Sequence, residues 1–132
     1  MMNKRIVLLT VLTAFLFAGL TVYAQSTGYD SAKVVSVMRA NVRLLSEARK
    51  AAGARDYFYA AESLMELARG MHSIREMAPP KGEAAQWRKT IDDVVAAAFA
   101  GIGAAGARDD VKLTNSIAEL GRLGGVGHGI FR

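Results

Sequence analysis

The residues best suited to chemistry lie near the end of the chain, where a histidine stands among glycines. Five of the nine residues from 121 to 129 are glycine, and His128 is one of two histidines in the sequence. Glycine inside a helix costs up to about 1 kcal/mol relative to alanine, so this stretch should fray unless something packs on it. On a helical wheel, His128 lies about 60° from Leu113, at the border of an apolar stripe. A flat apolar ligand that carries a metal would fit such a surface; a frayed end without function is the alternative.

The remaining candidates for chemistry have simpler explanations. His72 shares a segment with several methionines, a combination that can bind copper or haem, but methionine at helical spacing is typical of a core. Asp92 and Asp93 point about 100° apart on a helix, so they cannot act as a paired acid and base. The sequence has no spacing typical of a serine–histidine–carboxylate triad and no phosphate-binding glycine loop after a strand. We therefore expect no enzymatic activity.

The first 24 residues have the composition of a secretory signal peptide. Lys4 and Arg5 precede an apolar run over residues 6–20, and Val22-Tyr23-Ala24 offers a cleavage site. The apolar run is also long enough for an uncleaved membrane anchor, but the polar residues that follow favour removal. We expect a periplasmic mature chain of residues 25–132 with no stable membrane anchor.

Charge and cysteine content restrict the class of protein further. The net charge of +5 falls to +3 without Lys4 and Arg5, and the other basic residues are scattered along the chain. Nucleic-acid binding therefore has no support. The chain has no cysteine, so its stability must come from packing or from a bound cofactor rather than from disulfides.

After the signal peptide, apolar residues recur at helical spacing and no stretch alternates as a strand would. The pattern predicts helices over residues 30–52, 56–78 and 83–105 and from 109 or 110 to the end, with Pro79-Pro80 forcing an extended connection. These segments predict an all-α fold, an antiparallel up-down-up-down four-helix bundle without an internal repeat. The side chains expected to face inward include Val34, Val37, Met38, Asn41, Leu45, Ala48, Phe58, Ala61, Leu64, Met65, Ala68, Trp87, Ile91, Val94, Ala98, Leu113, Ile117, Leu120, Gly124 and Phe131.

The end of the chain reads Leu120-Gly121-Arg122-Leu123-Gly124-Gly125-Val126-Gly127-His128-Gly129-Ile130-Phe131-Arg132. It resembles the last helix of the cytochrome c-prime family, which ends in leucine-glycine, two residues, Cys-x-x-Cys-His, two residues, an aromatic residue and an arginine. Gly124 and Gly127 stand where that pattern has its cysteines. The run Val37-Met38-Arg39-Ala40-Asn41 is similar to the family's first-helix signature, and Trp87 after a proline break is similar too.

The departures from the family pattern bear on the cofactor. Without thiols no thioether bond to haem can form, and Val34 stands where the family usually has an arginine near the haem propionates. Related b-type cytochromes with the same bundle bind haem iron between an early methionine and a late histidine, and Met38 and His128 resemble that pair. The resemblance thus implies non-covalent, b-type haem with iron ligands His128 and Met38, and with Gly124, Gly127 and Phe131 also at the haem site. For Met38, an ordinary core methionine is the alternative.

Two functions of different classes follow. The first is a periplasmic haem protein for electron transfer or small-gas binding, for which the sequence indicates no particular redox partner. The second is a haem-free bundle that kept the fold after losing the cofactor and serves in binding, sensing or as a structural protein.

The sequence also predicts a homodimer through the first two helices, the pairing that the family resemblance implies. Val42, Leu44, Tyr57 and Tyr59 fall outside the expected core stripe, which leaves apolar surface for a partner to cover. Sedimentation of the mature chain at micromolar concentration should show a dimer, and a strict monomer would contradict this expectation.

Overall fold

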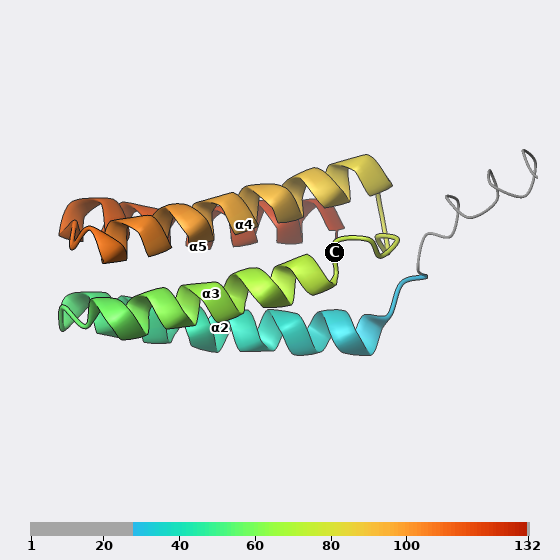
Figure 1. The fold of residues 1–132 in the computed structure, drawn as a ribbon. Helices are drawn as coiled ribbons and strands as arrows, with labels where there is room; N and C mark the ends of the chain where they lie inside the picture. The colour runs from blue at the N-terminus through green and yellow to red at the C-terminus, as the bar shows by residue number, and fades with distance from the viewer. Residues whose placement is uncertain (1–27, 132) are drawn as a thin grey trace, which may run out of the picture.

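The computed structural model describes residues 28–131, which form four helices that run alternately up and down (Figure 1). The helices are α2 (Ser31–Gly53), α3 (Tyr57–Ser73), α4 (Ala84–Gly106) and α5 (Asp110–Phe131). The expected all-α fold, an antiparallel up-down four-helix bundle, is confirmed. The predicted signal peptide and its cleavage site lie outside the described residues.

Aspartates begin three of the helices. The side chain of Asp30 accepts a hydrogen bond from the backbone N–H of Lys33 at 3.1 Å, and Asp56 accepts one from Tyr59 at 3.0 Å. Asp109 in the same way accepts the backbone N–H of Lys112 at 3.0 Å. Each bond satisfies a donor that the first turn of a helix leaves without an intrahelical partner, which fixes where these helices start.

The turns at one end of the bundle are copies of each other. The hexapeptide Ala-Ala-Gly-Ala-Arg-Asp occupies residues 51–56 and again residues 104–109. In both copies the aspartate N–H bonds to the carbonyl of the first alanine and the arginine N–H to that of the second, the pattern of a Schellman motif. The left-handed residue is the arginine in each, with φ 56° at Arg55 and 53° at Arg108, although glycine is the usual residue there.

The similarity continues into the helices that follow these turns. Ser, Glu, Leu and Arg at positions 63, 66, 67 and 69 recur 53 positions later, at 116, 119, 120 and 122. In both copies the arginine pairs with the glutamate three residues before it. The expectation of no internal repeat is therefore wrong: the α2–α3 hairpin and the α4–α5 hairpin are two versions of one unit.

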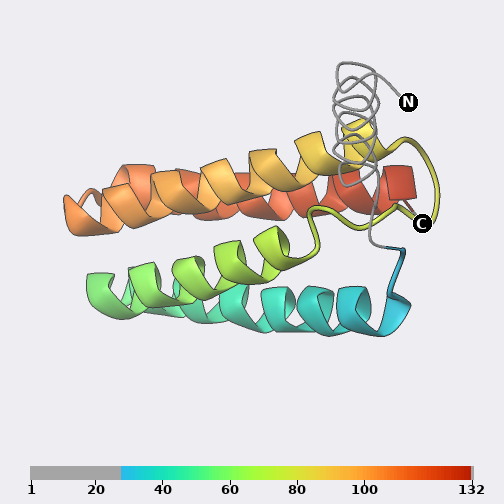
Figure 2. The ribbon, with the colours of Figure 1, turned by 45° about the vertical axis from the view of Figure 1, so that its right-hand side comes forward.

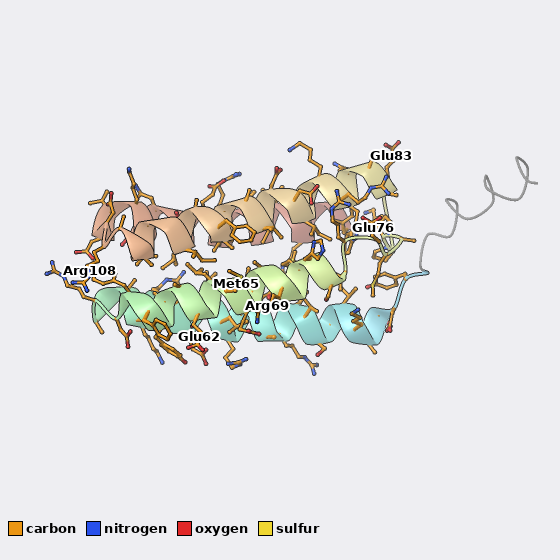
Figure 3. The ribbon with its side chains drawn as sticks, in the orientation of Figure 1. Glu62, Met65, Arg69, Glu76, Glu83 and Arg108 are labelled. Atoms are coloured by element: carbon orange, nitrogen blue, oxygen red, sulfur yellow. The ribbon has the colours of Figure 1, made fainter. Side chains whose placement is uncertain are left out.

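Corresponding residues of the two hairpins make corresponding contacts with the other hairpin. Arg55 in the first turn pairs with Asp110 of α5 at 3.2 Å, while Arg108 in the second turn lies 5.9 Å above the ring of Tyr57 in α3. Tyr57 and Asp110 occupy corresponding positions, and the Tyr57 hydroxyl donates to Asp110 at 2.7 Å. Figure 3 shows Arg108 at the end of the bundle that the two turns form. The two hairpins thus exchange equivalent contacts, as a two-fold relation requires.

The core lies between the hairpins and uses a different face of α3 from the one expected. Leu64, Leu67 and Met71 of α3 are buried, whereas Phe58 is 82% exposed, so its assignment to the core was wrong. Leu44 was expected at the surface but is buried, which removes it from the predicted dimer face. Gly124 was expected to face inward and is exposed.

The two seams between the hairpins differ in packing. Helices α3 and α4 pack closely, whereas α2 and α5 make few contacts (Figures 1 and 2). The repeat suggests why. Ala68, Met71 and Ile74 near the end of α3 are all buried, and the corresponding residues of α5 are Gly121, Gly124 and Gly127. Without side chains at these positions, α5 lacks the groups that fill the equivalent space beside α3.

Two glycines in the bundle should respond oppositely to the same substitution. A Cβ on Gly101 would lie 2.7 Å from Leu64 Cδ1 and 3.3 Å from Ser116 Cβ, whereas one on Gly124 meets nothing within 4 Å. Gly101→Ala should lower the free energy of unfolding by about 1–3 kcal/mol through overpacking. The higher helix propensity of alanine should offset up to about 1 kcal/mol of this loss.

Gly124→Ala, in contrast, should stabilise the protein by up to about 1 kcal/mol, because only the propensity term applies. Urea unfolding of the two variants beside the wild type measures both changes in the free energy of unfolding. Equal effects of the two substitutions would show that α3 and α4 do not approach as closely as the structure indicates.

Candidate functional site

The predicted iron ligands lie at one end of the bundle, on the two helices that make few contacts. The start of α2 and the end of α5 share the end opposite the two turns (Figures 1 and 2). Met38 belongs to the second turn of α2 and is half-buried against the core, whereas His128 belongs to the last turn of α5 and is exposed.

Met38 lies on the side of α2 that is turned toward α5. The adjacent residue, Val37, faces α3, where its Cγ1 lies 3.5 Å from the position of a Cβ on Gly70. The next residue in a helix is rotated by about 100°, which turns Met38 away from α3. The other helix in contact with α2 is α5, so the half-buried Met38 is oriented toward the α5 side of α2.

The corresponding argument places His128 beside the same seam. Gly127 faces α4, where a Cβ would lie 3.6 Å from Thr90 Cγ2. Gly124 and His128 lie about 60° and 100° around α5 from Gly127, so His128 is turned away from α4 and Gly124 lies between the two directions. A Cβ on Gly124 would meet open space, as would one on Gly121, so the surface of α5 beside His128 is backbone.

The repeat also sets the two ligands at a similar level along the bundle. Gly101 of α4 lies directly opposite Leu64 of α3, and the counterparts of these residues are Ala48 in α2 and Ile117 in α5. From Ala48, Met38 is ten residues back, or about 15 Å. His128 is eleven residues beyond Ile117, or about 16 Å, in the same direction along the bundle. The architecture therefore assigns both residues to one end of one seam.

Phe131 takes a different place from the one expected beside a cofactor. Its ring is buried and meets Trp87 edge to face, with ring centroids 5.1 Å apart. The same ring lies 3.4 Å from the position of a Cβ on Gly82, whose positive φ of 82° favours glycine. The indole N–H of Trp87 donates to the Ile74 carbonyl at 3.0 Å. Phe131 thus anchors the end of α5 on the α3–α4 connection.

His72 is exposed near the end of α3, next to a group of ion pairs. Arg75 donates to both carboxylate oxygens of Asp92 in α4, at 2.7 and 2.8 Å, and holds the pKa of Asp92 below its usual value. His72 contributes to that lowering as a nearby charge. Within residues 28–131, no three histidine or carboxylate side chains are grouped as metal ligands would be.

Sequence reasoning missed a groove of about 650 Å³ on the outer side of α2 and α3. Asn41 was assigned to the inward stripe and Ser63 was passed over, yet both line this groove. The signal that reveals it is the internal repeat, because the second hairpin has apolar residues where the first has Asn41 and Gly70.

Comparisons with known proteins add no support to the resemblance to the cytochrome c-prime family, which depends on the sequence motifs alone. No family model matches the chain, and searches of characterised proteins and of solved structures gave no significant match. Among the described residues, no helix is both long and apolar enough to cross a membrane.

The packing of Phe131 predicts a measurable role in stability. Phe131→Ala removes a buried ring and its edge-to-face contact, so it should lower the free energy of unfolding by about 3 kcal/mol. Val126→Ala on the same helix changes a side chain that is 44% exposed and should stay within about 0.5 kcal/mol of the wild type. Chemical denaturation of both variants provides the comparison. Similar small effects would mean that the end of α5 does not hold to the bundle through this ring.

Proposed function

We propose that this protein binds haem non-covalently in the seam between α2 and α5, with His128 and Met38 as the iron ligands. The observation that carries the proposal is the placement of these two residues beside one loosely packed seam, at a similar level. The residues present fit the group: imidazole and thioether are both haem ligands, and Gly121 and Gly124 leave the backbone of α5 open beside them.

The side chains around the seam set what such a site can do. When bound between imidazole and thioether, haem supplies a relatively high-potential centre for one-electron transfer. Met38 is half-buried and His128 exposed, so the ring would bury one face against the core and keep an edge in water. A site open in this way suits electron transfer, or binding of a small gas in place of the Met38 thioether. The proposed location is the periplasm, and the redox partner is a separate question.

Phe131 favours the alternative function, a haem-free bundle used in binding, sensing or structure. Its ring packs edge to face on Trp87, whereas the resemblance implied contact with haem. Gly127, which was also expected at the haem site, faces α4. The haem proposal therefore relies on Met38, Gly124 and His128.

Stability in the presence of haemin tests the proposal. A ligand that binds only the folded state adds about 2.7 kcal/mol of stability at a hundred times its Kd. The wild type should therefore unfold at a higher temperature with haemin, His128→Ala should gain much less, and Met38→Ala should fall between them. His72→Ala is the matched control, since it removes the other histidine and should respond as the wild type does.

If neither the wild type nor His72→Ala responds to haemin, the haem-free alternative replaces the proposal. If His128→Ala gains as much stability as the wild type, haem binds elsewhere on the molecule. A loss of the response in His72→Ala alone would move the ligand to the end of α3.

Any haem bound to the protein should be extractable. Gly124 and Gly127 carry no thiol, so only ligation and burial would hold the ring. Acid–acetone should strip it from the chain, and the pyridine haemochrome of the extract should have the b-type band. Haem that remains on the polypeptide after this treatment would contradict non-covalent binding.

A further inference from the structure

The outer groove between α2 and α3 contains buried polar atoms that the fold leaves without partners. Within the described residues, Asn41 Oδ1 and Ser63 Oγ are buried and accept or donate no hydrogen bond. Ser63 is only 2% exposed, and both residues line the groove. Leaving a buried polar atom unpaired costs stability, so such atoms call for an explanation.

Helix geometry alone does not explain the unpaired hydroxyl. Ser73, Thr90 and Ser116 are also in or at the end of helices, and each donates to a backbone carbonyl three or four residues earlier. Ser116 is the repeat counterpart of Ser63 and follows this pattern, with a bond of 2.9 Å to the Lys112 carbonyl. In Ser63 the hydroxyl is buried and makes no such bond.

The second hairpin has apolar, buried residues at the positions that correspond to the groove. Val94 and Leu123 stand where the first hairpin has Asn41 and Gly70, and both are buried. A Cβ on Gly70 would meet Val37 and Asn41 at 3.5 and 3.6 Å, ordinary contact distances, so close helix approach does not require glycine there. The groove is thus a property of the first hairpin that the shared fold does not impose.

Charges at the rim give the groove an acidic character. Of three carboxylates, Glu47 pairs with Arg43 and Glu66 with Arg69, both at 2.9 Å, and no ion pair in the described part of the chain involves Glu62. Figure 3 shows Glu62 and Arg69 where α3 passes over α2. One uncompensated negative charge remains, which favours a cationic ligand.

The pKa of Tyr59 at the same rim also indicates a negative potential there. Its pKa is raised above the ordinary value, first by the negative charge of Glu47, then by burial of the phenol and by a hydrogen bond to that carboxylate. Glu62 raises it further, and Arg43 opposes the shift. A negative potential opposes ionisation of the phenol, as it would attract an ammonium group.

We propose that this groove binds a linear aliphatic diamine or polyamine. Asn41 Oδ1 and Ser63 Oγ are covered in this structure, and rotation of the two side chains toward the groove would let them accept hydrogen bonds from ammonium groups. Glu62 would supply the opposing charge. The Val37, Ala40 and Leu44 side chains line the wall between them and suit methylene groups. Asn41 lies against Gly70, and Ser63 is seven residues before Gly70 in α3, so the two acceptors are roughly 10 Å apart along the helix.

This site is independent of the proposed haem seam. It lies on the α3 side of α2, whereas Met38 and His128 lie on the α5 side. Failure of one proposal leaves the other standing.

Calorimetry of the full mature chain with unbranched α,ω-diamines tests the proposal at low ionic strength. Affinity should peak for chains that separate the ammonium groups by about 10 Å, and the dicarboxylate of the same length should not bind. Ser63→Ala should weaken the best diamine at least tenfold, whereas Ser116→Ala, the same change at the repeat counterpart, should leave its affinity unchanged. Asn41→Val with Gly70→Leu copies the second hairpin and should abolish binding while the thermal transition is kept.

Gly70→Ala alone provides a milder variant should the double substitution fail to fold, and it too should weaken binding. The proposal is overturned if no diamine binds, if affinity ignores chain length, or if Ser63→Ala and Ser116→Ala behave alike. It is also overturned if the groove variants change only the sedimentation of the protein, because the groove would then belong to an interface with a second copy.

Discussion

The close approach of α3 to α4 is the constraint on which the rest of the structure depends. Gly101 makes it possible, because any side chain there would run into Leu64, which is fully buried and has little room to move. This seam joins the two hairpins, with the Arg55–Asp110 and Arg108–Tyr57 contacts fixing their relation at the turn end. The opposite seam, between α2 and α5, is left as the part of the bundle where packing is incomplete.

A duplicated hairpin would pack both seams alike if its two copies kept the same side chains. Here the two hairpins differ at most positions, and two groups of these differences leave space. Near the end of α5, Gly121 and Gly124 stand where α3 has the buried Ala68 and Met71, which leaves open space beside His128. On the first hairpin, Asn41 and Gly70 replace an apolar pair, which opens the outer groove. Each candidate site therefore lies where one hairpin lacks the buried apolar side chains that the other hairpin has at the corresponding positions.

Much of the fold was predictable because its determinants are local. Aspartate caps, the Pro-Pro break and helical periodicity located four helices to within a few residues, except that α3 ends at Ser73, several residues before the break. The buried face of α3 was not predictable in this way. Helical spacing assigns Phe58 to the inward stripe, whereas the rotation of α3 is set by its contacts with α2 and α4. Buried Ser63 gave no signal, since hydropathy assigns serine to the surface.

The candidate site was predictable in its residues and less so in its geometry. His128 and Met38 stood out by type and position, but the placement of both beside one seam depends on helix pairing, which the sequence pattern leaves open. Phe131 matched the expected pattern and yet packs on Trp87, because an aromatic ring at the end of a helix goes where tertiary contacts bury it. The repeat itself was readable from two copies of one hexapeptide and was missed because the first helices of the two hairpins share few residues.

The visible absorption spectrum of the purified protein tests the central claim most directly. The account predicts a Soret band that corresponds to one haem per chain and that is absent from His128→Ala prepared in the same way. A colourless wild-type protein that also shows no spectral change with added haemin would contradict it.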